Sequence, residues 1–563
     1  MTASKWDGLP LYDRPLGKAA EGIDDGRPVV TISNFSVCQP SESITESSES
    51  GCWQLVDFAT DEFEGKMLHA TKDNPPPDIT IPLNVEGWYA VYVWLMGSGT
   101  SLSEGELNYY CRYSQSNGPL LKLSNDKYFS GIFKTITHEN MAQPGLEGCF
   151  WRYADLTDES IVVRHQGHTV HLGAIRLIPL SPAEVAEVKK QRKDTSNKKL
   201  ILKTDSHAKS WVEAHTEFIR NSDVFAWMSG CQERHGLMNP NGAPGLLRWK
   251  QACEELGLEW YVCDRPSRWT PAFIYNSDVL QTDPRFNFFS SHLEYRCQER
   301  DGTPSNALSY AVPEVRGFML DRVRAVAKLG PDGFGYFFNR DPGMVLFEPA
   351  AVEGFREKYG VDARELHDLD DRLLDWRAGI ITSYMHEVRD ALDEVSKEKG
   401  LKRIKGVQLV LGSEAANRRW SYDVKRWIDD GLIDMLVIMP WADYPEWRLA
   451  QGIVKPDIKY FKSLVKGKDI PVISMWFSWE PEVIRANEYF ARAMEEYAEG
   501  ADGLSFWDQR MFRKAFSANR WVRLGHKEQL SEWVAEDFPL PPYMRLTRHA
   551  GKTTGRFQWG AGN

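Results

Sequence analysis

Apolar and polar residues follow two different patterns along this chain, and the change falls near residue 199. Between residues 28 and 180 the apolar residues form short segments separated by Gly, Asn, Ser and Pro, with no amphipathic helix between them. The clearest segments are residues 88–97, 106–114, 149–156, 160–165 and 170–180. Short strand-like runs at this spacing predict a β-sandwich over residues 28–180.

From Lys199 onward, strand-like apolar runs alternate with helical segments or long loops. The runs lie at residues 199–205, 223–230, 259–266, 334–338, 406–415, 433–443, 471–480 and 502–509. Eight strands that alternate with helices are typical of a (β/α)8 TIM barrel. The predicted fold class is therefore α/β, with a TIM barrel preceded by an N-terminal β-sandwich domain.

The same patterns set the expected domain boundaries. We expect an irregular N-terminal segment, a β-sandwich resembling carbohydrate-binding modules, a charged linker helix, the barrel as catalytic domain, and a loosely ordered C-terminal tail. These parts cover residues 1–27, 28–180, 181–198, 199–527 and 528–563.

Composition and charge restrict the classes of partner. Hydrophobic residues make up 42% of the chain and charged residues 26%, as in globular proteins. No run of about 18 apolar residues predicts a membrane span, and the absence of an apolar leader favours a cytoplasmic location, although a trimmed secreted chain would look the same. The net charge is −11 with scattered basic residues, which argues against nucleic acid. Homo-oligomer formation stays open.

Cysteine and aromatic residues add two further expectations. The eight cysteines form no CxxC pair, so free buried thiols are expected in place of a zinc site or a disulfide framework. The chain contains 21 Trp, 21 Tyr and 26 Phe residues. Their flat faces suit the stacking of sugar rings, but a large aromatic core would explain them equally well.

Polar residues gather where the predicted barrel strands end, at the face that carries active sites in such barrels. Residues 330–349, GPDGFGYFFNRDPGMVLFEP, show this best, because Asn339, Arg340 and Asp341 follow an aromatic run directly. The complete set of candidates is Asp205, His207, Asp264, Asn339, Arg340, Asp341, Glu348, Glu414, Trp441, Asp443, Trp476, Trp479, Glu480, Trp507 and Asp508.

Acids and indoles around one opening suit glycoside hydrolysis, in which one carboxyl protonates the leaving oxygen and a second attacks carbon or activates water. We expect Asp341 and Glu414 to form the catalytic pair, with Glu348 and Glu480 as replacements, and the other candidates to bind substrate. Three of these acids also have a structural explanation. Asp341 could form a turn before Pro342, Glu414 could lie at a helix N-terminus, and Glu348 could form a salt bridge within a loop.

Several segments resemble the glycosyl-hydrolase-like barrel proteins of polysaccharide-degrading bacteria. They are residues 332–392, beginning DGFGYFFNRDPG, together with VKRWIDDGLIDMLVIMPW, GADGLSFWDQ, RLGHKEQL and, at the end of the β-rich part, VHLGAIRLIPLSPAE. The resemblance implies a barrel that acts on carbohydrate, preceded by a β-sandwich module. Related barrels often have an Asp within the fourth strand, in a DGΦxΦD pattern, where this chain has Phe337.

The predicted function is hydrolysis of a glycosidic bond in an oligo- or polysaccharide, without a cofactor or a bound metal. Two alternatives remain. One is a metal-dependent sugar isomerase, aldolase or lyase that uses Asp205, His207 and Asp264. The other is a barrel that binds glycans without turnover, which Phe337 at the expected acid position favours.

Overall fold

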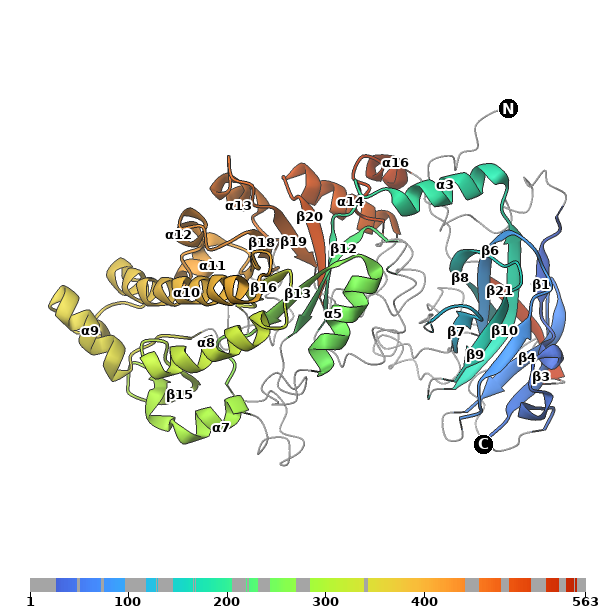
Figure 1. The fold of residues 1–563 in the computed structure, drawn as a ribbon, viewed down its shortest axis with the longest axis horizontal. Helices are drawn as coiled ribbons and strands as arrows, with labels where there is room; N and C mark the ends of the chain where they lie inside the picture. The colour runs from blue at the N-terminus through green and yellow to red at the C-terminus, as the bar shows by residue number, and fades with distance from the viewer. Residues whose placement is uncertain are drawn as a thin grey trace.

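The fold is taken from a computed structural model. It describes residues 27–47, 51–71, 75–96, 118–127, 129, 145–165, 167, 169–204, 219, 222–230, 244–269, 284–338, 343–440, 455–476, 486–507, 523–535, 543–550 and 552–553. Figure 1 shows the β-rich part and the barrel as separate bodies, with helix α3 between them.

Two sheets make up the β-rich part. The larger has nine strands: β1 (Val30–Ile32), β2 (Ile44–Thr45), β3 (Trp53–Thr60), β4 (Glu64–Ala70), β6 (Trp88–Met96), β8 (Gly145–Asp155), β10 (Val170–Pro179), β21 (Tyr543–His549) and β22 (Lys552–Thr553). The smaller contains β5 (Ile79–Pro82), β7 (Leu120–Leu123) and β9 (Ser160–Arg164). Two 3-10 helices, η2 (Phe35–Val37) and η3 (Ser41–Ser43), lie between β1 and β2.

Buried side chains from both sheets form one core, with Trp53 and Val91 on the larger sheet and Ile81 on the smaller. The region therefore consists of strands, as its pattern predicts, and the predicted strand 106–114 lies outside the described residues. Its assignment as a β-sandwich stays a prediction, because β21 pairs with both β8 and β3 and closes a ring of strands in the larger sheet.

Strand β21 corrects the expectation of a loosely ordered tail over residues 528–563. Its residues Tyr543 to Arg545 pair with β8, and Leu546 to His549 pair with β3. Met544 and Leu546 are buried on one side, so the strand contributes to the core as well as to the sheet. Local pattern gave no indication of this pairing, because its partners lie several hundred residues earlier in the chain.

The predicted linker over residues 181–198 contains helix α3 (Pro182–Lys193). Ser181 and Glu184 form a reciprocal capping box: the Ser181 backbone N–H donates to Glu184 Oε2 at 2.7 Å, and the Glu184 N–H donates to Ser181 Oγ at 3.3 Å. Val188 is buried against the larger sheet, and Arg192 donates to the Tyr153 carbonyl at 2.7 Å. The linker helix is thus packed onto the β-rich part.

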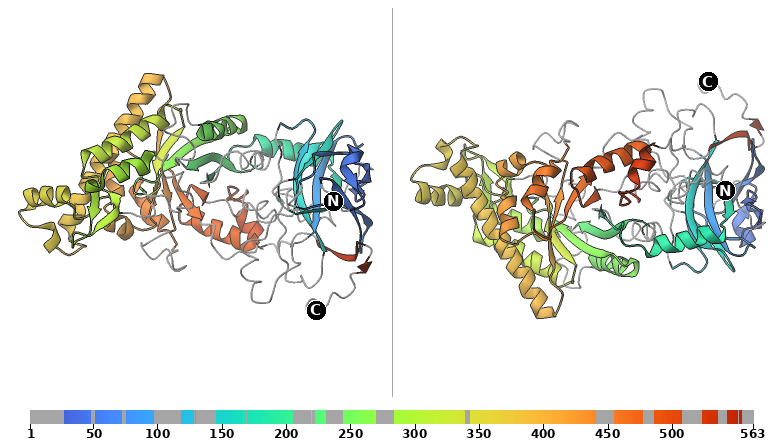
Figure 2. Two further views of the ribbon diagram at one scale, coloured as in Figure 1. Left: turned by 90° about the horizontal axis from the view of Figure 1, so that it is seen from below. Right: turned by 90° about the horizontal axis from the view of Figure 1, so that it is seen from above.

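The predicted eight-strand barrel is confirmed. Its parallel strands close in the order β11 (Leu200–Thr204), β12 (Val224–Gly230), β13 (Glu259–Asp264), β16 (Gly333–Tyr336), β17 (Lys405–Val410), β18 (Met435–Ile438), β19 (Val472–Trp476) and β20 (Gly503–Trp507), and β20 pairs with β11. Figure 2 shows helices around these strands. In a closed barrel the inward side chains of all strands share one interior.

The described helices of this part follow the strands in sequence. They are α5 (Pro244–Leu256), α7 (Pro284–Ser291), α8 (Pro313–Ala327), α9 (Pro349–Tyr359), α10 (Asp371–Lys399), α11 (Glu414–Arg419), α12 (Val424–Asp429), α13 (Ile458–Leu464), α14 (Ala486–Ala498) and α16 (Leu530–Ala535). The connection between β13 and α8 also carries η6 (Leu293–Tyr295) and a hairpin of β14 (Arg296–Gln298) and β15 (Pro304–Leu308), and η7 (Ala363–Glu365) precedes α10.

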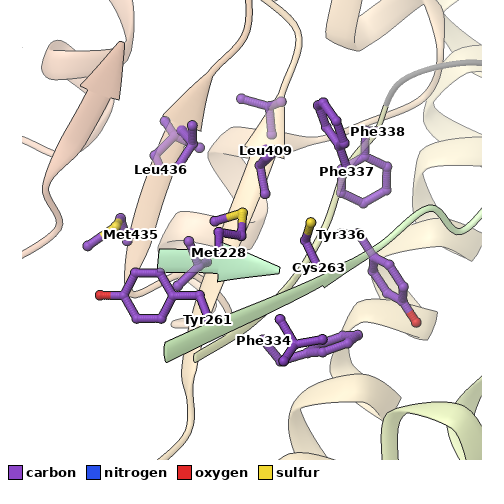
Figure 3. Packing of buried hydrophobic residues seen from close by; sticks show 14 of the residues in the cluster. Met228, Tyr261, Cys263, Phe334, Tyr336, Phe337, Phe338, Leu409, Met435 and Leu436 are labelled. Carbon is purple, nitrogen blue, oxygen red and sulfur yellow. The ribbon is translucent and has the colours of Figure 1, made fainter. Parts of the chain in front are cut away.

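Glycines in strand β16 permit tight packing inside the barrel. A Cβ on Gly335 would lie 1.5 Å from the Val407 carbonyl oxygen of the neighbouring strand, and one on Gly333 would lie 2.8 Å from the Tyr261 ring. The glycines of DGFGYFF therefore allow β17 and the large Tyr261 side chain to approach β16. Figure 3 shows Tyr261, Phe334 and Phe337 in this densely packed region.

Three histidines lie close together where β21 joins the larger sheet. His69 on β4 and His171 on β10 are directly paired, and their rings stack with centroids 4.4 Å apart. Burial of the ring, followed by the charges of His69 and His549, lowers the pKa of His171 from 6.5 to about 3. The pKa values of His69 and His549 are also lowered, mainly by burial.

We expect acid to destabilise the β-rich part through this cluster. A histidine whose pKa falls on folding binds fewer protons in the folded than in the unfolded state below pH 6.5, so stability is complete above that pH and is lost as the pH falls. At pH 5, each imidazole that stays neutral in the folded state lowers the free energy of unfolding by about 2 kcal/mol. Urea unfolding at pH 7 and pH 5 should show this decrease in stability, and the decrease should be smaller in His171→Gln.

A matched control is His367→Gln, since His367 is exposed and distant in sequence from the three-histidine cluster. This variant should keep the pH dependence of the wild-type protein. Equal pH dependence for wild type and His171→Gln would contradict the explanation.

Candidate active site

Two aromatic rings fill the barrel interior at the carboxyl ends of the strands. Phe337 follows β16, the fourth strand, and Trp507 ends β20, the eighth, so the two come from opposite sides of the barrel. Their ring centroids are 4.9 Å apart at an interplanar angle of 82°, an edge-to-face contact. Both are almost completely buried. Phe337, at the position where the resemblance noted in the sequence implies an acid, is therefore part of the aromatic packing of the interior.

Two cations contact the same pair of rings. Lys203 Nζ, from β11, lies 4.6 Å from the Phe337 centroid and 5.6 Å from the Trp507 centroid. Arg265 Cζ, directly after β13, lies 4.9 Å and 6.0 Å from the same centroids. Both distances are within the range of cation–π interaction. These four residues, Lys203, Arg265, Phe337 and Trp507, define the barrel mouth here. All four are buried, and they combine two aromatic rings with two cations.

Neither cation was among the predicted site residues. The sequence did contain a signal, since Lys203 interrupts the apolar run LILKT and Arg265 stands beside Asp264 at a strand end. Side chains alternate between the two faces of a strand. Lys203 and Trp507 are paired neighbours on β11 and β20, so both face the interior.

Asp264 faces the opposite way, into the layer between the barrel and its helices. Its Oδ2 accepts from Arg285 Nη2 of α7 at 2.6 Å and from Arg322 of α8, whose Nε and Nη2 both lie at 3.3 Å. Oδ1 accepts from the Arg265 N–H at 2.8 Å. All three side chains are buried. These contacts satisfy Asp264 without a ligand, and its predicted role in substrate binding is not needed to explain its position.

A tyrosine cluster extends this polar layer. The hydroxyls of Tyr336 and Tyr384 are hydrogen-bonded, and the Tyr310 hydroxyl donates to the Pro266 carbonyl at 2.8 Å. Burial raises the pKa of all three hydroxyls. The Phe337 N–H also donates to the Asp264 carbonyl at 2.8 Å. The outer layer thus holds the ends of β13 and β16, which are followed by Arg265 and Phe337 of the mouth.

Glu348 is a buried carboxylate at the start of α9. It accepts from the Ser309 hydroxyl, from the Leu346 N–H at 3.0 Å and from the Gln298 N–H at 3.4 Å. Burial raises the pKa of this carboxyl, and these donors oppose the shift. These contacts connect α9 with the β14–β15 hairpin, which is a structural role. Arg340, the salt-bridge partner proposed for Glu348 from sequence, lies outside the described residues.

Glu414 is the first residue of α11, consistent with the helix N-terminus considered above. It is exposed and lines a small cavity with Arg418, Asp423 and Tyr460. The cavity has a volume of about 60 Å³, against roughly 300–1,000 Å³ for typical ligand pockets. Burial and then the Glu414 charge raise the pKa of Tyr460.

Trp476, predicted as a stacking wall, is 1% exposed and faces the helix layer. Its Nε1 donates to Glu496 Oε2 of α14 at 2.7 Å, and Arg492 lies over its ring at 4.4 Å. Trp507 is buried against Phe337 as described above. In the described structure both indoles are packed into the protein, and neither presents an open face to a sugar.

The remaining candidates lie outside the described residues, and their roles stay predictions. They are Asp205, His207, Asn339, Arg340, Asp341, Trp441, Asp443, Trp479, Glu480 and Asp508. The predicted pair of Asp341 and Glu414 therefore stays a prediction, because one of its members is not described. Among the described candidates, Asp264, Glu348 and Glu414 lie in different surroundings.

The described residues also bear on metal binding, disulfides and membrane spans. No group of three or more His, Cys, Asp or Glu side chains there is arranged to hold a metal ion. None of the six described cysteines forms a disulfide with another described cysteine, and Cys111 and Cys231 lie outside these ranges. Of the helices described, none has the length and apolarity needed to cross a membrane.

No protein-family model and no curated protein matches the chain. Among solved structures, the β-amylase catalytic domain of Paenibacillus polymyxa is 10% identical, with a TM-score of 0.39 over 61% of this chain and 99% of that one. The PgaB glycoside hydrolase domain of Bordetella bronchiseptica is 11% identical, with a TM-score of 0.40 over 57% and 98%. The α-galactosidase of Thermus thermophilus is 13% identical, with a TM-score of 0.34 over 89% and 98%.

We expect Asp264→Asn to destabilise the barrel by about 3–5 kcal/mol, because it leaves the buried charges of Arg285 and Arg322 without their counterion. Urea unfolding followed by tryptophan fluorescence measures the loss. As a control, Asp371→Asn removes an ion pair with Arg418 whose aspartate side chain is 82% exposed, and it should cost less than about 1 kcal/mol. Similar small losses for both variants would contradict the structural role of Asp264.

Proposed function

We propose that the chain is a glycoside hydrolase whose active site lies at the carboxyl-end face of the barrel. The observation that carries the proposal is the closed eight-strand barrel, whose strands end immediately before acidic residues of the sequence. Asp205 is the next residue after β11, and Asp508 is the next after β20. Active sites of such barrels are built from the loops at this face.

The order of the strands adds a second pair of acids to the proposal. β11 and β20 are neighbours, and Lys203 pairs with Trp507. Asp205 and Asp508 come directly after these two strands in the sequence. Glycoside hydrolysis requires two carboxyls about 5–5.5 Å apart for retention or about 6.5–9.5 Å apart for inversion.

The pair expected from sequence, Asp341 with Glu414, remains a proposal beside Asp205 with Asp508. Glu480 stays a candidate because it also follows a barrel strand, β19, in sequence. Glu348 is the weakest of the set, because hydroxyl and backbone donors already occupy its oxygens. Of the three described candidate acids, Asp264 and Glu348 are buried and Glu414 is exposed.

A non-catalytic glycan-binding barrel is the second candidate function, and one observation favours it. Phe337, where related barrels often have an acid, packs against Trp507 and leaves no acid at that position. The metal-dependent alternative has less support, since Asp264, one of its three proposed ligands, is held by two arginines. A buried carboxylate that already pairs with two cations does not suit a metal ion as a third.

The first experiment is turnover of a broad panel of glycans and aryl glycosides by wild type and by single variants. Loss of a catalytic acid or base costs about 10²–10⁴-fold in kcat. We expect that loss in Asp341→Asn and Glu414→Gln if the sequence pair is correct, and in Asp205→Asn and Asp508→Asn if the adjacent-strand pair is correct. Glu398→Gln, near the far end of α10, serves as the control and should retain full activity.

Two outcomes of the turnover experiment would contradict the proposal. Turnover by wild type with no loss in any of the four variants would contradict both pairs and direct attention to Glu480. Binding of a glycan without turnover on the whole panel would contradict hydrolysis and support the binding-only barrel.

A further inference from the structure

The small cavity that contains Glu414 lies in the helix layer, among α10, α11, the start of α12, and α13. Leu374 contributes an apolar wall, and Glu414, Ser421, Asp423 and Tyr460 contribute polar groups. The cavity has a volume of about 60 Å³. A water molecule needs roughly 10–15 Å³ of such space, so the cavity has room for about four waters or for the tip of a ligand of that size.

The two cations on the wall of this cavity, Arg418 and Lys425, already have partners outside it. Arg418 Nη2 donates to Asp371 Oδ1 at 2.7 Å and lies 3.2 Å from Asp375 Oδ1. Lys425 forms an ion pair with Asp429, one turn further along α12. Neither cation therefore requires a negative charge from inside the cavity.

The two carboxylates of the cavity have no such partner. Among the described residues, no lysine, arginine or histidine forms an ion pair with Glu414 or Asp423. Asp423 Oδ1 accepts from the Arg426 N–H at 3.0 Å, which leaves Oδ2 for another donor. Both charges also act on one group, because, after burial, they raise the pKa of the Tyr460 hydroxyl. The described walls therefore give the cavity a net negative character.

A buried hydroxyl in the same cavity lacks a hydrogen-bond partner. Ser421 is 5% exposed, and its side chain makes no hydrogen bond with any residue that the structure describes. Its backbone has a φ of 65° and donates from its N–H to the Arg418 carbonyl at 2.9 Å. Polar groups buried to this extent are normally hydrogen-bonded, so the Ser421 hydroxyl indicates a donor that enters the cavity.

A primary ammonium group matches these walls. It carries one positive charge and three N–H donors, which can reach Glu414, Asp423 and Ser421. The Tyr460 ring adds a surface for cation–π contact, and Leu374 suits a short carbon stem. A metal ion is a poorer match, because no group of three or more His, Cys, Asp or Glu side chains in the described ranges is arranged to hold one.

We propose that this cavity binds the primary ammonium group of a small organic ligand through Glu414, Asp423 and Ser421. The inference does not rest on hydrolysis, and Asp423 and Ser421 belong to neither proposed carboxylate pair. The site lies beside the barrel mouth: Tyr422, also on its wall, packs against Phe338 with ring centroids 4.6 Å apart, and Phe338 follows Phe337. Two sources offer such a group, small alkyl amines and amino sugars.

The test compares ligands that differ in the ammonium group. Dissociation constants are measured at pH 7 by saturation-transfer NMR for propylamine and 1-propanol, and for glucosamine and glucose. We expect at least one amine to bind in about the millimolar range and about tenfold or more tightly than its neutral partner. The preference should decline as salt increases. Tighter binding of glucosamine than of propylamine identifies an amino sugar as the ligand, and the reverse identifies an alkyl amine.

Variants then assign the preference to the cavity. Asp423→Asn removes a charge but keeps a side chain that caps α12 equally well, and Ser421→Gly removes the hydroxyl at a φ that glycine adopts freely. Each should reduce the amine-to-neutral ratio about fivefold or more. Asp390→Asn is the matched control, because Asp390 is exposed and lies about 24 Å along α10 from Leu374. It should keep the wild-type preference.

Amine binding and glycoside turnover are separate measurements, so the two proposals fail separately. Selective amine binding without turnover on the glycan panel keeps the inference and contradicts hydrolysis. Turnover by a protein that binds neither amine more tightly than its neutral partner keeps hydrolysis and overturns the inference. An amine preference unchanged in both Asp423→Asn and Ser421→Gly also overturns it, and so does an equal loss in Asp390→Asn.

Discussion

The edge-to-face contact between Phe337 and Trp507 determines the character of the barrel mouth. Closure of eight parallel strands directs the inward side chains of opposite strands toward one axis, and large residues there fill the interior. Once these rings occupy the axis, Lys203 and Arg265 pack against them as buried cations. The glycines of β16 make this packing feasible, because they let Tyr261 and β17 approach closely.

Alternation along the strands divides the charges between two layers. Asp264 points outward and is neutralised by Arg285 and Arg322, whereas Arg265, the next residue, extends into the mouth. The outer layer therefore acts as a support: its buried ion pairs and hydrogen bonds hold the strand end that presents the inner cation. A change in Asp264 is therefore expected to disturb the position of Arg265 as well, because the Arg265 N–H donates to Asp264 Oδ1.

The β-rich part depends on a contact between distant ends of the chain. β21 inserts between β8 and β3 and buries Met544 and Leu546. The chain thus leaves the β-rich part through α3, forms the barrel, and returns to complete the first sheet. His549 arrives with β21 near His69 and His171, and burial lowers the pKa of His171 and His549, so acid is expected to act on this part of the sheet.

The sequence by itself determined the order of strands and helices, and from that order the barrel was predicted, because alternation and helical periodicity are local properties. Only the tertiary structure decided the surroundings of each polar residue. Asp264 is held by arginines from two later helices, Glu348 is buried against Ser309, and Trp476 packs on α14. These outcomes, like the return of β21, depend on contacts between residues far apart in sequence, and burial and pairing free energies are set by those contacts.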